Sequence, residues 1–210
     1  MILPLDDDGL AAAAAAVAQG RCVVLPTDTV YGIGADAFSA RAVQGLLDAK
    51  RRSRDMPPPV LLPDAALLDA VAAEVPEAAW RLTAAFWPGA LTVILRAALP
   101  LDLGDRPDTI AVRVPAHEAA RALLRVTGLL AVSSANVSGL PPATTAGEAE
   151  AMLGDSVAVY LDGGPTPGDM PSTIVDLASD PDRGRVVRQG VISFDALRAV
   201  WPGILGAADA

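Results

Sequence analysis

The sequence predicts an α/β protein built on a mixed β-sheet that is flanked by helices. Two observations lead to this prediction: short apolar runs that stop at proline or glycine, and amphipathic segments that start at capping residues. The third is their order, because the two kinds of segment do not alternate strictly, as a purely parallel sheet would require. The length of 210 residues favours a single domain over 1–210, with a frayed tail after Trp201.

The apolar runs predict a sheet of about seven strands, for which eight segments are candidates. The first run ends at Pro26, and the second follows three prolines, which cannot continue the helix expected before them. The candidate strands cover residues 21–25, 60–62, 91–96, 109–114, 129–132, 157–161, 173–177 and 185–188.

Capping residues predict where several helices begin. The expected pairs of cap and helix are Asp8 with 9–18, Ser39 with 40–50, Thr145 with a helix that ends at 153, and Ser193 with the last helix. Apolar periodicity adds candidate helices over 64–73, 76–86 and 116–126.

Composition and charge exclude several classes of protein. A net charge of −9 argues against a broad nucleic-acid surface, which needs many clustered cations. The single cysteine, Cys22, cannot form an intramolecular disulfide, and together with the single histidine, His117, it cannot build a zinc site without several carboxylates. We therefore expect no tightly bound protein metal, and we expect any Mg²⁺ to arrive with a phosphate ligand.

The N-terminal segment predicts neither export nor a membrane anchor. Asp6, Asp7 and Asp8 make it negative, whereas a signal peptide needs a positive start. No stretch of 18 or more strongly apolar residues follows, so we expect a cytoplasmic protein.

The only lysine of the chain, Lys50, lies in the cationic run Lys50–Arg54. Like charges repel, so such a cluster needs an anion or bulk water to neutralise it. An ammonium binds phosphate as a point charge and guanidinium groups add bidentate hydrogen bonds, so the run could form a polyphosphate site. From this segment alone, a solvated helix end is the simpler explanation, because the helix dipole favours cations there.

Three polar loops and two arginines reverse that preference. The loops are Pro26–Gly32, Ser133–Gly139 and Pro171–Thr173, and the first two leave strand ends, where ligands gather in α/β proteins. Arg113 and Arg188 lie within apolar strands, where a charge must be paired or face a polar cavity. Ordinary turns and ion pairs would explain each feature singly, but together they favour a site for a small anion. His117 fits a helix start and Cys22 the core, so neither suggests covalent catalysis.

In this order along the chain, the segments resemble those of the YrdC/TsaC family of L-threonylcarbamoyladenylate synthases, over about residues 10–198. The matching segments are Pro26–Gly32, Lys50–Arg52, Arg113–Pro115, Ser134–Gly139, Pro171–Asp176 and Arg188–Gly190. The resemblance implies a twisted mixed sheet with a central cationic cavity, in the short single-domain form. The chain departs from the family pattern at Arg51, where glycine is usual, at Ser53, where proline is usual, and at Met56, where lysine is frequent.

The resemblance also implies that L-threonine, bicarbonate and ATP, with Mg²⁺ on the ATP, give threonylcarbamoyl-AMP and pyrophosphate. A partner transferase complex would then move the threonylcarbamoyl group to a tRNA adenosine, giving t6A, so this chain itself would bind tRNA weakly or indirectly. The residues it implies for the ATP phosphates are Lys50, Arg52, Ser134, Asn136 and Arg188, with Lys50 and Arg52 as the catalytic pair. Those it implies for threonine are Thr29, Tyr31, Arg113 and Ser172.

Two other functions stay open at this point. One is a carbamoyladenylate-forming domain related to hydrogenase maturation factors, although such domains sit in larger chains with zinc-finger segments and this chain is short and poor in cysteine. The other is an RNA-binding module without catalysis. The net charge of −9 and the small number of aromatic residues, 3 Trp, 2 Tyr and 3 Phe, argue against it.

Overall fold

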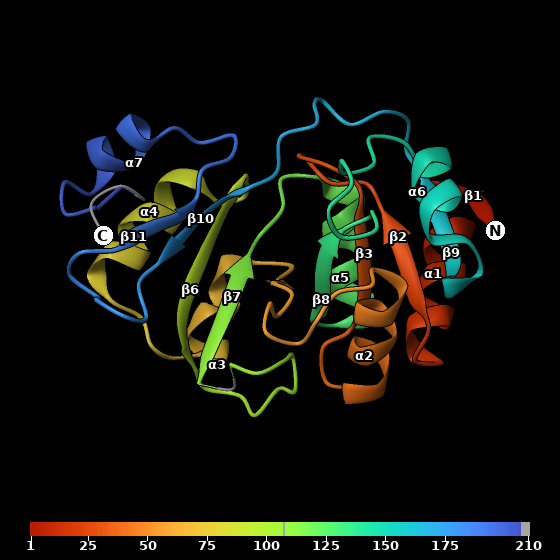
Figure 1. Ribbon diagram of the computed structural model, residues 1–210, viewed down its shortest axis with the longest axis horizontal. Helices are drawn as coiled ribbons and strands as arrows, with labels where there is room; N and C mark the ends of the chain where they lie inside the picture. Colours follow the sequence, from red (N-terminus) through yellow and green to blue (C-terminus); the bar gives the residue numbers. More distant parts are fainter. Residues whose placement is uncertain (107, 207–210) are drawn as a thin grey trace.

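A mixed, twisted β-sheet forms the centre of the molecule (Figure 1), as the sequence predicted. The computed structural model describes residues 1–106 and 108–206. Within them the sheet has 11 strands, in the order β1-β9-β2-β3-β8-β4-β7-β6-β10-β11, and β5 pairs with β6 beside this path. The strands are β1 (Ile2–Pro4), β2 (Cys22–Leu25), β3 (Gly32–Asp36), β4 (Val60–Leu61), β5 (Ala72–Glu74), β6 (Leu91–Ala97), β7 (Thr109–Arg113), β8 (Leu130–Ser134), β9 (Val157–Asp162), β10 (Thr173–Asp176) and β11 (Arg185–Arg188).

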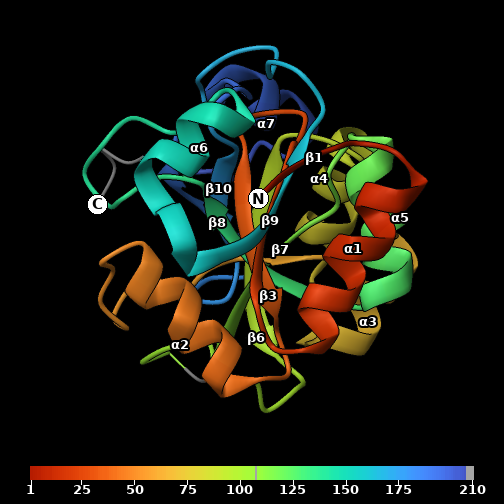
Figure 2. The same cartoon turned by 90° about the vertical axis from the view of Figure 1, so that its right-hand side faces the viewer.

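Helices cover both faces of this sheet, with α2 and α6 on one side and α1 and α5 on the other (Figure 2). Strand β2 serves both sides, because Cys22 and Val24 pack in one hydrophobic cluster while Val23 and Leu25 pack in another. The helices are α1 (Asp7–Ala18), α2 (Ala40–Ala49), α3 (Leu68–Val71), α4 (Glu77–Phe86), α5 (Glu118–Thr127), α6 (Ala146–Leu153) and α7 (Phe194–Val200). Among the described residues, none of these helices has the length and apolar character needed to cross a membrane.

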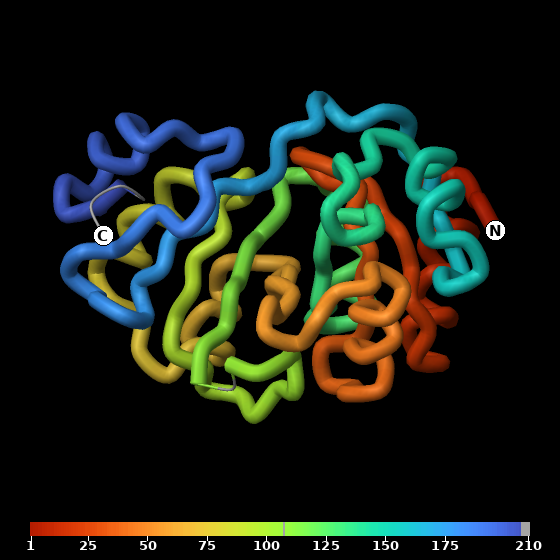
Figure 3. Tube along the Cα trace, in the orientation of Figure 1, coloured from red at the N-terminus to blue at the C-terminus, as the bar shows by residue number. Residues whose placement is uncertain are grey.

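The shortest strand on the main path, β4, joins the two halves of the sheet. Val60 and Leu61 pair antiparallel with β8 on one side and parallel with β7 on the other. On the side of Pro57–Pro59 the last bond to β8 runs from the N–H of Val132 to the carbonyl of Pro59, because these prolines have no N–H to donate. Beyond β4, therefore, the ends of β8 and β7 are not bridged. Between β9 and β10 the chain crosses from one half to the other (Figure 3).

Three strands, β1, β3 and β5, were not predicted. Two of the five residues of β3 are glycines, which weaken the strand pattern, yet β3 pairs with β2 and β8 inside the sheet. A Cβ on Gly32 would lie 2.7 Å from Cγ1 of Val132, so close packing against β8 requires glycine there. Both glycines of β3, Gly32 and Gly34, are therefore buried within the sheet.

Several predicted boundaries need correction. Asp6, not Asp8, caps α1, with its Oδ1 accepting a hydrogen bond from the N–H of Gly9. The helix expected over 64–73 is divided into a 3-10 turn (Ala65–Leu67), α3 and β5. The predicted frayed tail is ordered as far as 206, because Ile204 is buried in the core and Leu205 pairs with Arg185; residues 207–210 lie outside the described residues. The caps at Ser39, Thr145 and Ser193 are confirmed.

Candidate functional site

A cavity of about 370 Å³ lies where the two halves of the sheet diverge. Its walls come from β3 and β8 in one half, and from β6, β7, β10 and β11 in the other. The charged residues that line it are Arg52, Arg106, Arg113, Arg188, Asp55 and Asp176. Of the nine residues that the sequence assigns to substrates, seven line this cavity: Thr29, Tyr31, Arg52, Arg113, Ser134, Ser172 and Arg188.

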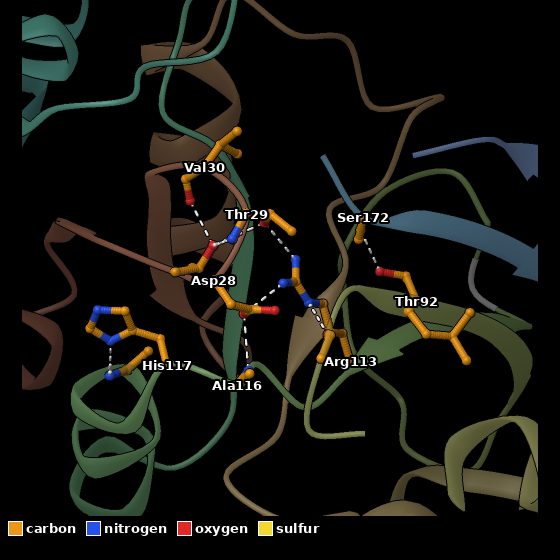
Figure 4. A network of polar contacts seen from close by, with 12 residues as sticks. Asp28, Thr29, Val30, Thr92, Arg113, Ala116, His117 and Ser172 are labelled. Atoms are coloured by element: carbon orange, nitrogen blue, oxygen red, sulfur yellow. Dashed lines mark hydrogen bonds and ion pairs between the residues drawn. The ribbon is translucent and has the colours of Figure 1, made fainter. Parts of the chain in front are cut away.

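Arg113, at the end of β7, is buried and neutralised (Figure 4). Its Nη2 forms an ion pair with Oδ1 of Asp28 at 2.7 Å, its Nη1 donates to Oγ1 of Thr29 at 3.0 Å, and its Nε donates to the carbonyl of Gly89 at 2.8 Å. Burial lowers the pKa of Arg113, and the Asp28 carboxylate opposes that shift. Arg113 therefore fastens the loop Pro26–Gly32 to the β6–β7 half of the sheet.

The direction of the hydrogen bonds in that loop can be derived from its acceptors. Thr27 Oγ1 lies 2.6 Å from the carbonyl of Val30, which can only accept, so the Thr27 hydroxyl proton is committed there. Between Thr27 Oγ1 and Thr29 Oγ1, 3.0 Å apart, Thr29 must then be the donor. Thr29 Oγ1 also accepts from Arg113, so it presents only a lone pair to the cavity. It can accept a hydrogen bond from an amine, but it has no proton left for a carboxylate.

Arg52 and Arg188 carry charge that no described carboxylate bonds. Arg188 donates from Nε and Nη2 to the carbonyl of Ser172 and from Nη2 to its Oγ, at 2.9–3.3 Å. Arg52 donates to the carbonyls of Met56 and Pro57 and, at 3.0 Å, to Oγ of Ser133. Burial lowers the pKa of Arg188, and repulsion from Arg113 and Arg52 lowers it further. Burial lowers the pKa of Arg52, and the charge of Asp55, which also lines the cavity, opposes that shift without forming an ion pair.

Lys50 and Asn136 contact each other and are not among the residues that line the cavity. The Nζ of Lys50 lies 2.5 Å from the carbonyl oxygen of Ser134, 2.8 Å from that of Asn136 and 3.2 Å from Asn136 Oδ1. Only 1% of Lys50 is exposed, and burial, with a further contribution from Arg52, lowers its pKa to about 8. The phosphate roles assigned to both residues stay predictions.

Tyr31 and Ser172 reach the cavity with hydroxyl groups that already have partners. The Tyr31 hydroxyl donates to the carbonyl of Gly164 at 2.7 Å and accepts from the N–H of Gly163, which ties it to the crossing segment after β9. Burial raises the pKa of Tyr31. Ser172 Oγ lies 2.8 Å from Oγ1 of Thr92 (Figure 4), so one proton of that pair remains available to a ligand.

The structure adds cavity residues that the sequence did not single out. Thr92 and Ile94 are two residues apart along β6, so both side chains lie on the cavity side of the strand. The presence of a polar residue in an apolar strand was the signal that could have identified Thr92. Arg106 lies in the β6–β7 connection, for which the sequence predicted only a loop. His117 caps α5 and Cys22 is buried, as predicted. The described residues contain no group of three or more His, Cys, Asp or Glu placed to hold a metal ion.

Known proteins resemble this chain in sequence and in fold. A family model described as Sua5/YciO/YrdC, telomere recombination, matches residues 15–190. A relative from Mycobacterium tuberculosis, itself named only provisionally as a threonylcarbamoyl-AMP synthase, is 47% identical over 194 residues, or 91% of this chain and 88% of the relative. The threonylcarbamoyl-AMP synthase of Bacillus subtilis is 38% identical over 202 residues, covering 94% of this chain and 58% of the relative.

The fold agrees equally well with a solved structure. Pyrococcus abyssi Sua5 complexed with L-threonine superposes with a TM-score of 0.90 at 32% identity, covering 98% of this chain and 62% of that one. This chain therefore spans less than two thirds of the Bacillus and Pyrococcus proteins. The breadth of these matches confirms the resemblance seen in the motifs, and the chain belongs to the Sua5/YciO/YrdC family.

Proposed function

We propose that the protein is an ATP-dependent L-threonylcarbamoyl-AMP synthase. The amine of threonine and bicarbonate would condense to a carbamate with loss of water, a carbamate oxygen would attack the α-phosphorus of ATP, and pyrophosphate would leave. The name of the Bacillus subtilis relative and the threonine complex of the Pyrococcus abyssi protein support this assignment. Such a reaction depends on positioning and charge neutralisation rather than on a covalent nucleophile.

The observation that carries the proposal is the pair of arginines without a carboxylate partner. Arg52 and Arg188 face one cavity from opposite walls and repel each other, so the site favours a ligand with several negative charges. The triphosphate of ATP meets that requirement, and guanidinium groups bind phosphate oxygens with paired hydrogen bonds. The Ser134 hydroxyl on the β8 wall would contact a phosphate or carbamate oxygen.

The polar network around Arg113 suits threonine. Thr29 Oγ1 offers a lone pair, so we assign it to the threonine amine. Three of the five N–H groups of Arg113 are already bonded, which leaves two that could reach the threonine carboxylate together with the Ser172–Thr92 pair. Tyr31 would form part of the wall beside them.

The remaining participants follow from the chemistry of the substrates. Mg²⁺ would enter with the ATP phosphates, because this ion prefers phosphate and water ligands to an all-protein cage. The mixed anhydride product would pass to a partner transferase complex that modifies a tRNA adenosine to t6A. That role would place the protein in the cytoplasm, with little direct contact with tRNA.

The test is pyrophosphate release from ATP, with L-threonine and bicarbonate each present or omitted. We expect release only when both are present, together with a product that has the mass of threonylcarbamoyl-AMP. Release that ignores threonine would contradict the synthase assignment, and release that needs added carbamoyl phosphate would point to a carbamoyladenylate-forming enzyme. No release, with salt-dependent tRNA binding instead, would contradict the synthase assignment in favour of an RNA-binding module.

A further inference from the structure

We propose that Lys50 is a positioning residue, whose ammonium holds the turn after β8 in the shape that presents Ser133 and Ser134 to the cavity. The effect on catalysis rests on the proposed function, whereas the structural part can be tested without any substrate. This role differs from the phosphate contact that the sequence favours for the only lysine of the chain.

The ammonium of Lys50 is fully occupied inside the protein. An ammonium has three N–H donors, and three oxygens lie within 3.2 Å of Nζ: the carbonyls of Ser134 and Asn136 and the side-chain oxygen of Asn136. To touch a phosphate in the cavity, Lys50 would have to leave these three buried acceptors without a donor, which is unfavourable. The contacts therefore favour a lysine that stays where it is.

The backbone of Lys50 holds the other end of the same turn. Its carbonyl accepts a hydrogen bond of 2.8 Å from the N–H of Ser138. Inside the turn, Asn136 Nδ2 donates to the carbonyls of Val137 and Leu140. Lys50 caps the C-terminus of α2, so one helix end fixes both the entrance and the exit of this turn.

The spacing of Lys50 and Arg52 now has a geometric explanation. Lys50 donates to the carbonyl of Ser134 and is not among the cavity-lining residues, whereas Arg52 donates to the hydroxyl of Ser133 and lines the cavity. Arg51 stands between them with φ of 51°, in the left-handed region, so the chain turns at this residue. A lysine and an arginine two residues apart thereby clamp two consecutive serines of one strand.

The charge of Lys50 makes this clamp sensitive to pH. Arg52 is the charged group whose field acts on Lys50, and it favours loss of the proton. The turn packed against Lys50, residues 134–139, has no titratable side chain, and Asp48 of α2 accepts its hydrogen bond from Gln44. A neutral amine has only two N–H donors, so deprotonation releases one of the three oxygens of the turn.

Hydrogen exchange in the ligand-free protein tests the proposal. Lys50→Met keeps the apolar stem and removes the donors, so the bonded amides of the turn should exchange about tenfold faster than in the wild type. Those amides are Ala135, Asn136, Ser138 and Leu140. Arg51→Met is the matched control, because it removes a charge from the exposed neighbouring position and should leave exchange unchanged. Arg188→Met should also leave exchange unchanged while weakening the binding of inorganic tripolyphosphate.

A pH profile separates this role from simple support of the fold. In the wild type, kcat/KM for ATP should fall above pH about 8, because the neutral amine holds one oxygen of the turn fewer. Opening that returns Lys50 to water becomes less favourable from pH about 8 to 10.5, so exchange of the four amides, corrected for its intrinsic rate, should slow over that range. Lys50→Met should lack both transitions. If it does not fold, Asn136→Asp replaces it, because that change keeps an acceptor for the lysine and removes the hydrogen bonds that Asn136 Nδ2 donates to Val137 and Leu140; exchange of the four amides should then rise above that of the wild type by less than in a variant without the lysine donors.

Two outcomes would overturn the proposal. One is exchange in Lys50→Met that stays within about twofold of the wild type. The other is a loss of tripolyphosphate affinity in Lys50→Met as large as in Arg188→Met, which would make Lys50 a phosphate ligand. Wild-type protein that releases no pyrophosphate would remove the proposed function and would leave the exchange test intact.

Discussion

Arg113 at the end of β7 and Arg188 at the end of β11 have the same pattern in the sequence and different surroundings in the structure. Arg113 is 6% exposed and bonds the carboxylate of Asp28, whereas Arg188 bonds only the oxygens of Ser172. The same sequence pattern thus occurs with a buried, paired arginine and with an exposed arginine that has no carboxylate partner among the described residues. Arg113 holds the loop of the site in place, and the charge of Arg188 remains available to attract an anion.

The difference has a thermodynamic consequence that can be measured. Removal of the partner of a buried charge lowers the stability of the protein, because the remaining charge stays buried without compensation. Removal of an unpaired cation that lies near other cations should raise stability slightly, because it relieves repulsion. Variants on the Arg113 side should thus lower stability, and variants on the Arg188 side should lower activity at nearly unchanged stability.

Asp28→Asn should have the largest effect on stability. The change preserves the shape of the side chain but leaves the guanidinium of Arg113 buried without its counter-charge, which should lower the free energy of unfolding by about 3 kcal/mol. Chemical denaturation would measure it, with Asp48→Asn, a surface change on α2, as the matched control. A loss below that of the control would mean that solvent or a neighbouring dipole already compensates Arg113.

Arg188→Met should have the largest effect on activity. Removal of a guanidinium from the anion site should lower kcat/KM for ATP about a hundredfold, mainly through KM, because charged hydrogen bonds to phosphate are lost. The melting temperature should stay constant or rise slightly, since the repulsion with Arg52 and Arg113 disappears. Arg185→Met, at the exposed start of the same strand, is the control. A large fall in stability with intact ATP affinity would mean that Arg188 supports the fold and does not bind ATP.

Local signals in the sequence predicted much of this arrangement. Proline stops, capping residues and apolar runs located most strands and helices, and the polar loops at strand ends brought Thr29, Ser134 and Ser172 to one cavity. Strand β3 was not predicted because its glycines are needed for close approach to β8, a contact between distant segments. The direction of the Lys50 side chain depends on the turn after β8, 84 residues away, and no local pattern contains that information.

The pKa of Lys50 offers a direct test, because the chain has no other lysine. With lysine labelled at ¹⁵Nζ, one side-chain resonance should titrate near pH 8, below the ordinary value of 10.5. The unfolded chain then binds this proton more tightly, so from pH about 8 to 10.5 the contribution of Lys50 to stability rises, by about 3 kcal/mol in all. Activity should fall across the same window.

Urea denaturation at several pH values, with Lys50→Met as reference, would isolate that contribution. Below pH 8 both states hold the proton and the difference between the two proteins should be constant. A titration midpoint of the Lys50 resonance close to pH 10.5 would mean that the ammonium is solvated and does not bond the turn after β8.

The smallest expected effect concerns Arg51, where the family usually has glycine. Its φ of 51° lies in the left-handed region, which costs a residue with a Cβ roughly 1–2 kcal/mol, whereas glycine adopts it freely. Glycine also makes the unfolded chain more flexible, at roughly 0.5–1 kcal/mol, so Arg51→Gly should raise the free energy of unfolding by about 0.5 kcal/mol. Because the backbone turn between Lys50 and Arg52 is preserved, the exchange of the amides after β8 should not change. A loss of stability in Arg51→Gly would mean that the guanidinium of Arg51 makes a stabilising contact that offsets the backbone conformation.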